Sequence, residues 1–317
     1  MFFFPKGEDD LVDKHRGLTV GLVANRLIAA AISKSVSPAY NDILDKCQKG
    51  FIPFEAIDDN ILYFNRIFQD CVEAKEQFYV FLMDYLKAFD SVFHDFIDNV
   101  AVLKRLGSPR WFINSVRNLF KDIEVCVEMG LAAIFFAIEK GIKQGCPLSP
   151  LLFLIAFDVF LTDYHNRRKR AYAEDLAAAL RNLRLQLPDL VDRTKPFGVA
   201  SGLCLNFIKS LLVSSLPPSQ DDVDFAAGYG FTIVDAGEYL GILFGRRKVV
   251  WVHNVHAKAD KKFNARTLLF LPLKSSISVQ RRIRLSNSHL ITLYSYVGRF
   301  YFPPAEANIT FLTNLRA

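Results

Sequence analysis

Two apolar stretches of the sequence end in carboxylates that could share a divalent cation. Asp84 follows the run FYVFLM at 78–83, and Glu174 and Asp175 stand in the segment AYAEDLAAAL at 171–180. Mg²⁺ prefers hard oxygen ligands and keeps positions for water and phosphate, so carboxylates converging from separate strand ends are what such a site requires. Taken singly, each acid is equally typical of a solvated turn or a helix cap.

The elements around Asp84 follow from the spacing of apolar residues. Over 57–76 these residues recur at intervals of three and four, which predicts an amphipathic helix. The unbroken run 78–83 predicts a strand buried on both faces. A second helical pattern over 92–103 closes at Gly107. A strand that passes into a helix through a polar turn is a common place for a functional site.

The rest of the chain mixes hairpins with helices. Alternation over 123–138 predicts a hairpin, and the apolar stretch 150–160 predicts a helix. FTIV at 231–234 and EYLGILF at 238–244 predict a second hairpin, with its turn at 235–237. This order of elements predicts an α+β fold rather than a regular βαβ alternation.

Composition predicts a globular protein of a reducing compartment. Of the 317 residues, 51% are hydrophobic and 23% charged, which allows a sizeable core. We expect no membrane span, because every run of eighteen apolar residues is interrupted by charge, and no signal peptide, because Lys6 follows MFFFP too soon. The five cysteines form no CxxC pair, which disfavours a zinc ribbon or a disulfide framework. An intracellular location is expected, with nucleus and cytoplasm both open.

Positive charge gathers towards the C-terminal end. From Arg246 to Arg299 there are twelve Lys or Arg and one acid, Asp260, a local net charge of +11; the whole chain carries +6, so the remainder carries −5. Such a block is typical of a polyanion-binding surface, because neutralised phosphates release counterions. A solvated helical face is the alternative. The change of composition after Gly245 predicts a subdomain boundary.

Several segments resemble, in order, the motifs of non-LTR (LINE-type) retrotransposon reverse transcriptases. FPKGEDDLVDKHRGLTV at 4–20 is similar to the family's Lys-Pro-Gly-Lys-Asp and Tyr-Arg-Pro-Ile-Ser-Leu stretches, and Arg26-Leu27 and Gln48-Lys-Gly50-Phe51 resemble the next two motifs. MDYLKAFDSVFHDF at 83–96 resembles the first palm motif, and GIKQGCPLSPLLFLIAFD at 141–158 matches the second almost letter for letter. AYAEDLAAAL resembles the Tyr/Phe-Ala-Asp-Asp motif, SGLCLNFIKS at 201–210 the segment after it, and EYLGILF the primer-grip hairpin.

The resemblance implies an α+β right-hand polymerase with fingers, a palm whose antiparallel sheet is flanked by helices, and a helical thumb. The fingers would span 1–77, the palm 78–245 with inserted finger segments that include the primer-grip-like hairpin, and the basic helical thumb 246–317. The implied activity is RNA-directed DNA polymerisation on an RNA template and a DNA primer, with deoxynucleoside triphosphates and two Mg²⁺ ions, or Mn²⁺ in their place. Oligomeric state is left open.

The resemblance also implies roles for charged residues. Asp84, Glu174 and Asp175 would be the metal ligands and hence catalytic. Lys6 and Arg16 would neutralise triphosphate oxygens, which suits an ammonium and a guanidinium fork. An exposed surface cation is the plainer alternative for both.

Four further residues would contact the nucleotide or the leaving group. Phe89 would screen the incoming sugar against a ribose 2′-hydroxyl, with core packing as its alternative. Gln144 and Gly145 would approach the nucleotide or template base; their alternative is an ordinary loop before a helix with Ser149 as N-cap and Pro150 as first residue. Lys209 would protonate the leaving pyrophosphate, or would simply be solvated.

Two departures from the family bear on activity. Glu174 stands where the family has Asp, and its extra methylene moves the carboxylate by more than about 1 Å, a displacement that can cost about 10²-fold in rate. Only 22 positions separate Pro150 from Tyr172, fewer than the family usually has. We therefore expect the strand before the acidic hairpin to be missing and the hairpin to be poorly formed.

These departures leave two hypotheses of different class. The first is an active RNA-directed DNA polymerase; the second is a degenerate, catalytically inactive relative that retains nucleic-acid binding. An intron-encoded maturase or a telomerase-like polymerase is a further alternative. The sequences Lys87-Ala-Phe-Asp90 and Gln144-Gly-Cys-Pro-Leu-Ser-Pro150 favour the retrotransposon branch instead. No segment resembles the endonuclease domain of full-length elements, so a core or a fragment of a longer element protein is expected.

Overall fold

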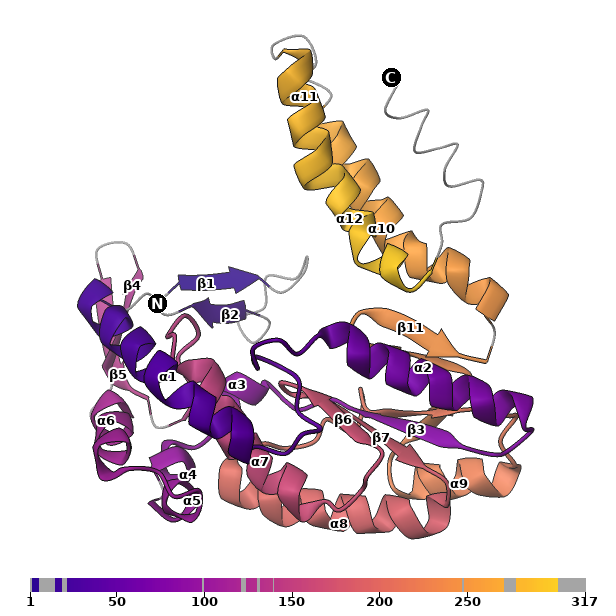
Figure 1. The fold of residues 1–317 in the computed structure, drawn as a ribbon, viewed down its shortest axis with the longest axis horizontal. Coiled ribbons are helices and arrows are strands. Elements are labelled where there is room, and N and C mark those ends of the chain that lie inside the picture. The colour runs from indigo at the N-terminus through magenta and orange to yellow at the C-terminus, as the bar shows by residue number, and fades with distance from the viewer. Residues whose placement is uncertain are drawn as a thin grey trace.

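A computed structural model describes residues 2–5, 15–18, 22–98, 100–120, 124–129, 132–138, 140–246, 248–270 and 278–301. At its centre is a five-stranded sheet in the order β6-β7-β3-β8-β9 (Figure 1). These strands are β3 (Tyr79–Met83), β6 (Lys169–Tyr172), β7 (Asp175–Leu180), β8 (Leu211–Ser214) and β9 (Thr232–Val234). Neighbouring strands are antiparallel except for β8 and β9, which are parallel.

Helices cover both faces of this sheet, as Figure 1 shows. On one face lie α7 (Ser149–Asp163), α8 (Leu183–Ser201) and α9 (Gln220–Gly228). On the other lie α2 (Ile57–Glu73) and a hairpin of β10 (Ala236–Tyr239) and β11 (Ile242–Gly245). The mixture of sheet and helices confirms the predicted α+β class, and α2 confirms the predicted amphipathic helix.

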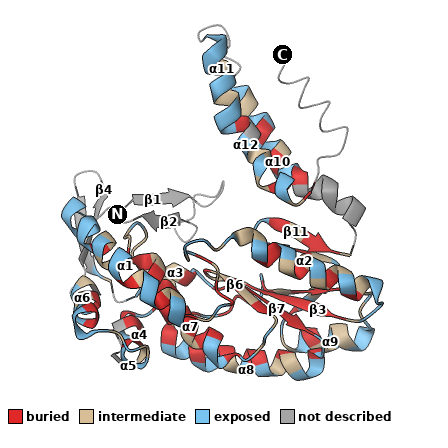
Figure 2. Ribbon diagram, in the orientation of Figure 1, coloured by how far each residue is buried: buried red, intermediate tan, exposed pale blue. Residues whose placement is uncertain are grey.

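The core has two layers that meet at β3. Tyr79, Phe81 and Met83 pack into the cluster formed with α7 and α8, whereas Val80 and Leu82 pack into the cluster beneath α2. Every residue of β3 is buried, which confirms the prediction of a strand covered on both faces (Figure 2).

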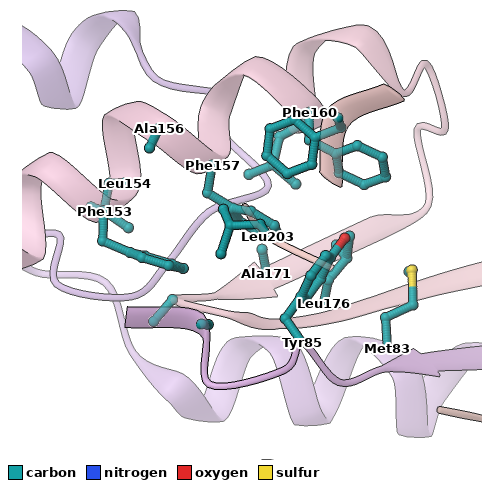
Figure 3. Packing of buried hydrophobic residues seen from close by; sticks show 14 of the residues in the cluster. Met83, Tyr85, Phe153, Leu154, Ala156, Phe157, Phe160, Ala171, Leu176 and Leu203 are labelled. Atoms are coloured by element: carbon teal, nitrogen blue, oxygen red, sulfur yellow. The ribbon is translucent and has the colours of Figure 1, made fainter. Parts of the chain in front are cut away.

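Helix α7 supplies most of the bulk under the sheet. All residues from 151 to 158 are buried, as expected of a helix that is apolar all round. Phe153, Phe157 and Phe160 line up along it, and Phe157 meets Tyr85 edge to face with ring centroids 5.1 Å apart (Figure 3). This packing anchors the chain immediately after Asp84.

The remaining elements lie at the two ends of the sheet. Towards one end are α1 (Val23–Ile43), α3 (Ala88–Ser91), α4 (His94–Asp98), α5 (Val100–Arg105), α6 (Arg110–Phe120) and the hairpins β1 (Phe2–Pro5) with β2 (His15–Leu18) and β4 (Glu124–Met129) with β5 (Ala132–Ala137). The β4–β5 hairpin confirms the one predicted over 123–138.

The C-terminal helices, α10 (Lys248–Phe270), α11 (Val279–Leu285) and α12 (Thr292–Ser295), rise from the other end. A π-helical turn (Ser286–Ile291) joins α11 to α12, and a 3-10 turn (Val297–Arg299) follows. Among the helices in the described ranges, none is both long and apolar enough to cross a membrane. The domain boundaries at 77 and 245 stay predictions.

The helix predicted over 92–103 is present from His94 to Asp98 (α4) and from Val100 to Arg105 (α5), with residue 99 outside the described residues. It begins two residues later than predicted, because the backbone groups before it make tertiary hydrogen bonds: Phe93 N–H donates to Ser201 O at 2.9 Å, and Val92 O accepts from Gly141 N–H at 2.7 Å. A periodic pattern records which face is buried but not these bonds.

The second predicted hairpin has its turn in a different place. β9 joins the main sheet beside β8, and the hairpin is β10–β11 with its turn at Leu240-Gly241 rather than 235–237. Gly237 instead lies so close to the sheet that a Cβ there would meet side-chain atoms of Leu211 and Val213 at 2.7 and 2.8 Å. Gly237, which the sequence predicted in a turn, is instead favoured at this position because its backbone lies close to the sheet.

The strand β6 is present and the acidic hairpin is formed, so the expectation of a missing strand and a poorly formed hairpin was wrong. β6 pairs with β7 from Lys169↔Ala178 to Tyr172↔Asp175. The short connection suffices because α7 ends at Asp163 and the chain turns directly into β6, where Lys169 Nζ forms an ion pair with Asp45 Oδ2 at 2.8 Å.

Candidate active site

Asp84 is the first residue after β3, and a neighbouring loop holds it in place. Its N–H donates to Ser210 Oγ at 3.1 Å, and its carbonyl accepts from Asn206 N–H at 2.8 Å. Asn206 Nδ2 also donates to Asp84 Oδ2 at 2.9 Å. Asn206 is buried and fixes one carboxylate oxygen of the half-buried Asp84. The other carboxylate oxygen is therefore the better placed to accept an external ligand.

Asp175 lies opposite Asp84 across the ladder. Met83 pairs with Leu176, so the next position of the antiparallel register sets Asp84 against Asp175. Directly opposed residues of an antiparallel pair share a face, with Cβ atoms about 5 Å apart. Glu174 precedes Asp175 in the two-residue turn, after Ala173, whose φ of +53° is left-handed.

The three carboxylates interact electrostatically. Burial, and then the charges of Glu174 and Asp84, raise the pKa of Asp175 to about 7. Like charges held close together disfavour ionisation, and a bound cation reverses that effect. The fold thus brings together the three acids predicted from the sequence.

The acidic site does not form a closed metal cage. Within the described part of the chain, no group of three or more His, Cys, Asp or Glu side chains is arranged to hold an ion by itself. Mg²⁺ in nucleotide-handling sites is usually held by one or two carboxylates together with substrate phosphates. Asp84 and Asp175 fit a cation of that kind, which would reach the site with its nucleotide.

Phe89 lies between the core and the surface. Its ring stacks on Phe153, with centroids 4.3 Å apart, and meets Phe51 edge to face at 6.2 Å. The side chain is half-buried. The core-packing interpretation is therefore correct for one face of the ring, and the remaining exposure leaves the screening role as a prediction.

The loop that carries Gln144 and Gly145 is fastened to the segment after Asp84. Ile142 N–H donates to Phe89 O at 2.7 Å, and Gln144 Nε2 donates to Asp90 Oδ1 at 3.0 Å. Gly145 has a φ of +100°, which favours glycine, and is exposed. Phe89, Gln144 and Gly145 are thereby brought together.

The start of α7 differs by one residue from the prediction. The helix begins at Ser149 rather than after it, and Ser149 Oγ donates to Lys143 O at 2.7 Å instead of capping the helix. Pro150 accordingly lies second in the helix, where its missing N–H is still harmless.

The remaining predicted site residues are placed less closely. Lys209 is exposed, its backbone N–H donates to Asn206 Oδ1 at 3.3 Å, and the residue after it, Ser210, accepts from Asp84 N–H. Arg16 lies in β2 opposite Phe4, and Lys6 lies outside the described residues. The roles of these three residues stay predictions.

Three supporting residues received no role from the sequence. Asn206 and Ser210 stand in the segment SGLCLNFIKS, where the resemblance itself pointed to an Asn and a Ser, so a signal existed. Gln48 was quoted only as part of a motif, yet its side chain bonds the backbone of the acidic turn.

Comparison with known proteins places these observations in a family. The family described as "Reverse transcriptase (RNA-dependent DNA polymerase)" matches residues 4–244. The retrovirus-related Pol polyprotein from type-2 retrotransposable element R2DM of Drosophila melanogaster is 28% identical over 250 residues, which cover 72% of this chain and 23% of that protein. The type-1 element R2 polyprotein of Popillia japonica is 26% identical over 213 residues, 63% of this chain and 29% of that protein. The chain thus spans less than a third of either relative.

A solved structure shares the fold. Telomerase from Candida tropicalis in complex with a TWJ fragment of telomeric RNA superposes with a TM-score of 0.52 over 89% of this chain and 49% of that one, at 11% identity. Such a likeness concerns the fold alone, and it confirms the predicted right-hand polymerase architecture.

Proposed function

This chain belongs to the reverse transcriptase (RNA-dependent DNA polymerase) family, as a non-LTR retrotransposon reverse transcriptase domain, and on that premise we propose that it extends a DNA primer on an RNA template. The observation that carries the proposal is the placement of Asp84 opposite Asp175 at the ends of β3 and β7. Two carboxylates from neighbouring strands on one face of a sheet suit nucleotidyl transfer.

Asp84 and Asp175 would hold the divalent ions together with the triphosphate, and Glu174 would add its negative charge beside them. Two bound Mg²⁺ ions, or Mn²⁺, would activate the primer 3′-hydroxyl and neutralise charge on the triphosphate. The protein's own contribution is orientation: Asn206 fixes one oxygen of Asp84, and the β3–β7 ladder fixes Asp175. Burial and the neighbouring carboxylates raise the pKa of Asp175, and a bound cation would favour its ionised form.

The incoming deoxynucleoside triphosphate would lie against Phe89 and the Gln144–Gly145 loop. Phe89 is half-buried and stacked on Phe153, and the part of the side chain that stays exposed would exclude a ribose 2′-hydroxyl. Lys6 and Arg16 would neutralise the triphosphate, and Lys209 would donate a proton to the pyrophosphate. Replacing Phe89 by Ala should increase ribonucleotide incorporation relative to deoxynucleotide incorporation.

The C-terminal helices would grip the primer–template duplex. Lys261, Lys262, Arg281 and Arg284 are exposed on α10 and α11. Contacts from such cations to phosphates carry no sequence information and weaken steeply as salt rises. The proposed partners are therefore an RNA template and a DNA primer bound mainly through their backbones.

Primer extension on an RNA template with Mg²⁺ tests the proposal directly. Asp84→Asn should lower deoxynucleotide incorporation by about 10³-fold, because it removes the charge that a cation needs. Asp192→Asn is the matched control, since Asp192 is exposed and makes only a local ion pair with Lys195. Equal activity in Asp84→Asn and the unaltered chain would refute the assignment.

The same assay separates the alternative function. No incorporation by any variant, with duplex binding intact and sensitive to salt, would identify a catalytically inactive protein that retains nucleic-acid binding. A filter-binding titration of the same duplex at two salt concentrations supplies that second measurement.

A further inference from the structure

The segment from Cys47 to Gly50 runs along the outer edge of β6. Ala171 N–H donates to Cys47 O at 2.9 Å, and Lys49 N–H donates to Ala171 O at 2.8 Å. Gln48 and Ala171 thus form a parallel bridge. This attachment carries the segment directly to the turn that holds Glu174.

The side chain of Gln48 bonds the turn itself. Its Nε2 donates to Ala173 O at 3.0 Å, and its Oε1 accepts from Ala173 N–H at 2.9 Å and from Gly50 N–H at 2.8 Å. Gln48 is only 2% exposed. One buried amide therefore satisfies both backbone groups of Ala173, and buried polar groups of this kind are costly to leave unpaired.

Gly50 closes on the same turn from the side. A Cβ on Gly50 would meet Ala173 N at 2.2 Å and Tyr172 C at 2.9 Å, both of them backbone atoms. Its φ lies outside the left-handed region, so the backbone conformation does not require glycine. The requirement is close approach to the turn.

A second set of bonds supports the strand that leads into the turn. Asn60 Nδ2 donates to Ala171 O at 3.0 Å, and the Tyr239 hydroxyl donates to Arg170 O at 3.2 Å. These residues come from α2 and β10, whereas among the side chains that the structure describes it is Gln48 that bonds Ala173. Within this part of the chain, the hydrogen bonds to the turn thus come from one side chain.

We propose that Gln48, with Gly50, is a positioning clamp that sets the orientation of Glu174 and Asp175 by fixing the backbone of Ala173. The inference deepens the proposed polymerase function and rests on it for its catalytic consequence. Left-handed backbone at a non-glycine residue persists only where its surroundings impose it. In the absence of the clamp, the turn can relax and carry its two carboxylates away from Asp84.

Gln48→Met tests the clamp, because it keeps the length of the side chain and removes its hydrogen bonds. Gln77→Met is the matched control: Gln77 Nε2 donates to Ser214 Oγ at 2.9 Å, before β3 begins and at the end of the sheet away from Asp84. Hydrogen–deuterium exchange at the Ala173 amide should accelerate at least about tenfold in Gln48→Met and stay unchanged in Gln77→Met.

The catalytic readout is a split between kcat and KM. In Gln48→Met, kcat should fall about 10²-fold and the Mg²⁺ concentration for half-maximal rate should rise, with KM for the deoxynucleotide changing less than about threefold. Gln48→Glu is a second variant that keeps the two accepted bonds, loses the donated one and adds a buried charge facing Ala173 O. Exchange at the Ala173 amide in this variant should lie between that of the unaltered chain and that of Gln48→Met.

Gly50→Ala tests the clamp by adding a Cβ that would collide with the backbone of the turn. It should lower kcat as Gln48→Met does, whereas Gly228→Ala, at a glycine with no atom near its Cβ position, should be silent. Unchanged exchange at Ala173 in Gln48→Met would overturn the clamp, as would equal kcat losses in the Gln48 and Gln77 variants. If the unaltered chain incorporates no nucleotide, the proposed function fails, and the exchange measurement still decides the clamp.

Discussion

The acidic hairpin β6–β7 and the hairpin β10–β11 have the same type of turn but carry different side chains. Each has a two-residue turn with a non-glycine residue in the left-handed region, Ala173 at φ +53° and Leu240 at φ +52°. In each, the carbonyl of that residue accepts a hydrogen bond from a distant side chain. Gln48 Nε2 donates to Ala173 O at 3.0 Å, and the Tyr296 hydroxyl donates to Leu240 O at 2.6 Å.

The two turns differ in what holds them and in what they carry. The anchor of the acidic turn is a buried amide that bonds both backbone groups of Ala173, and the turn carries two carboxylates. The anchor of the second turn comes from the C-terminal helical region, and the turn ends in an exposed Gly241. The turn that carries the carboxylates is thus held through both backbone groups of one residue, whereas the other turn is held by one bond to a neighbouring region.

Neutralising one carboxylate in each hairpin should give the largest difference between the two hairpins. Asp175→Asn should reduce deoxynucleotide incorporation by about 10³-fold without changing duplex affinity, because it removes charge from the cation site. Glu238→Gln, in β10, only loses the ion pair with Lys258 and should leave incorporation nearly unchanged. Single-turnover primer extension measures both; equal losses would contradict the division of roles.

Glu174→Asp, in the acidic hairpin, should change deoxynucleotide incorporation in the opposite direction. The shorter side chain restores the family's geometry at the acidic turn, so incorporation should rise by up to about 10²-fold. Primer extension at saturating Mg²⁺ provides the measurement. A fall in rate would show that the turn has adapted to Glu174.

The acidic hairpin should also respond to pH, measured without divalent cations. The folded state raises the pKa of Asp175 from 3.8 to about 7, so its proton stabilises the fold fully below pH 3.8, and this contribution is lost as pH rises through about 7. We expect the free energy of unfolding to fall across this window by about 2 kcal/mol more in the unaltered chain than in Asp175→Asn. Urea titrations at several pH values check it; Glu238→Gln should leave the slope intact.

Tyr296→Phe addresses the anchor of the second turn and should have the smallest effect. Losing one hydrogen bond to Leu240 O should lower the free energy of unfolding by about 1 kcal/mol. Tyr172→Phe, beside the acidic turn, is the control: within the described part of the chain its hydroxyl makes no hydrogen bond, and we expect a loss of less than about 0.5 kcal/mol. A larger loss in the control would overturn this account.

Local patterns predicted the elements that are defined by burial alone. The strand at 78–83 and the helix at 57–76 appear as expected, because apolar spacing reports directly which faces are covered. The helix over 92–103 was predicted to start two residues too early, because the backbone groups of Val92 and Phe93 bond Gly141 and Ser201, which no local pattern records. The turn of the second hairpin was misplaced because Gly237 serves close packing.

The candidate site was predicted in part through resemblance and in part through residue chemistry. Asp84, Glu174 and Asp175 stand in motifs, and the fold brings them together. Gln48 could not have been assigned its contact, since its partner lies 125 positions away and the bond depends on how the segment after α1 meets β6. Asn206 was within reach because the motif contains it, but its contact with Asp84 spans 122 positions.

Those long separations give the bonds around Asp84 and Ala173 a consequence for folding kinetics. β6 and β7 are close in sequence and can pair early, whereas the contacts from Gln48 and Asn206 require closure of loops of more than a hundred residues. In the acidic hairpin, the pairing of β6 with β7 should therefore form before the carboxylates reach their final orientation. During refolding, catalytic competence should emerge later than the sheet signal, and the interval between the two is the time that the distant segments need to find the turn.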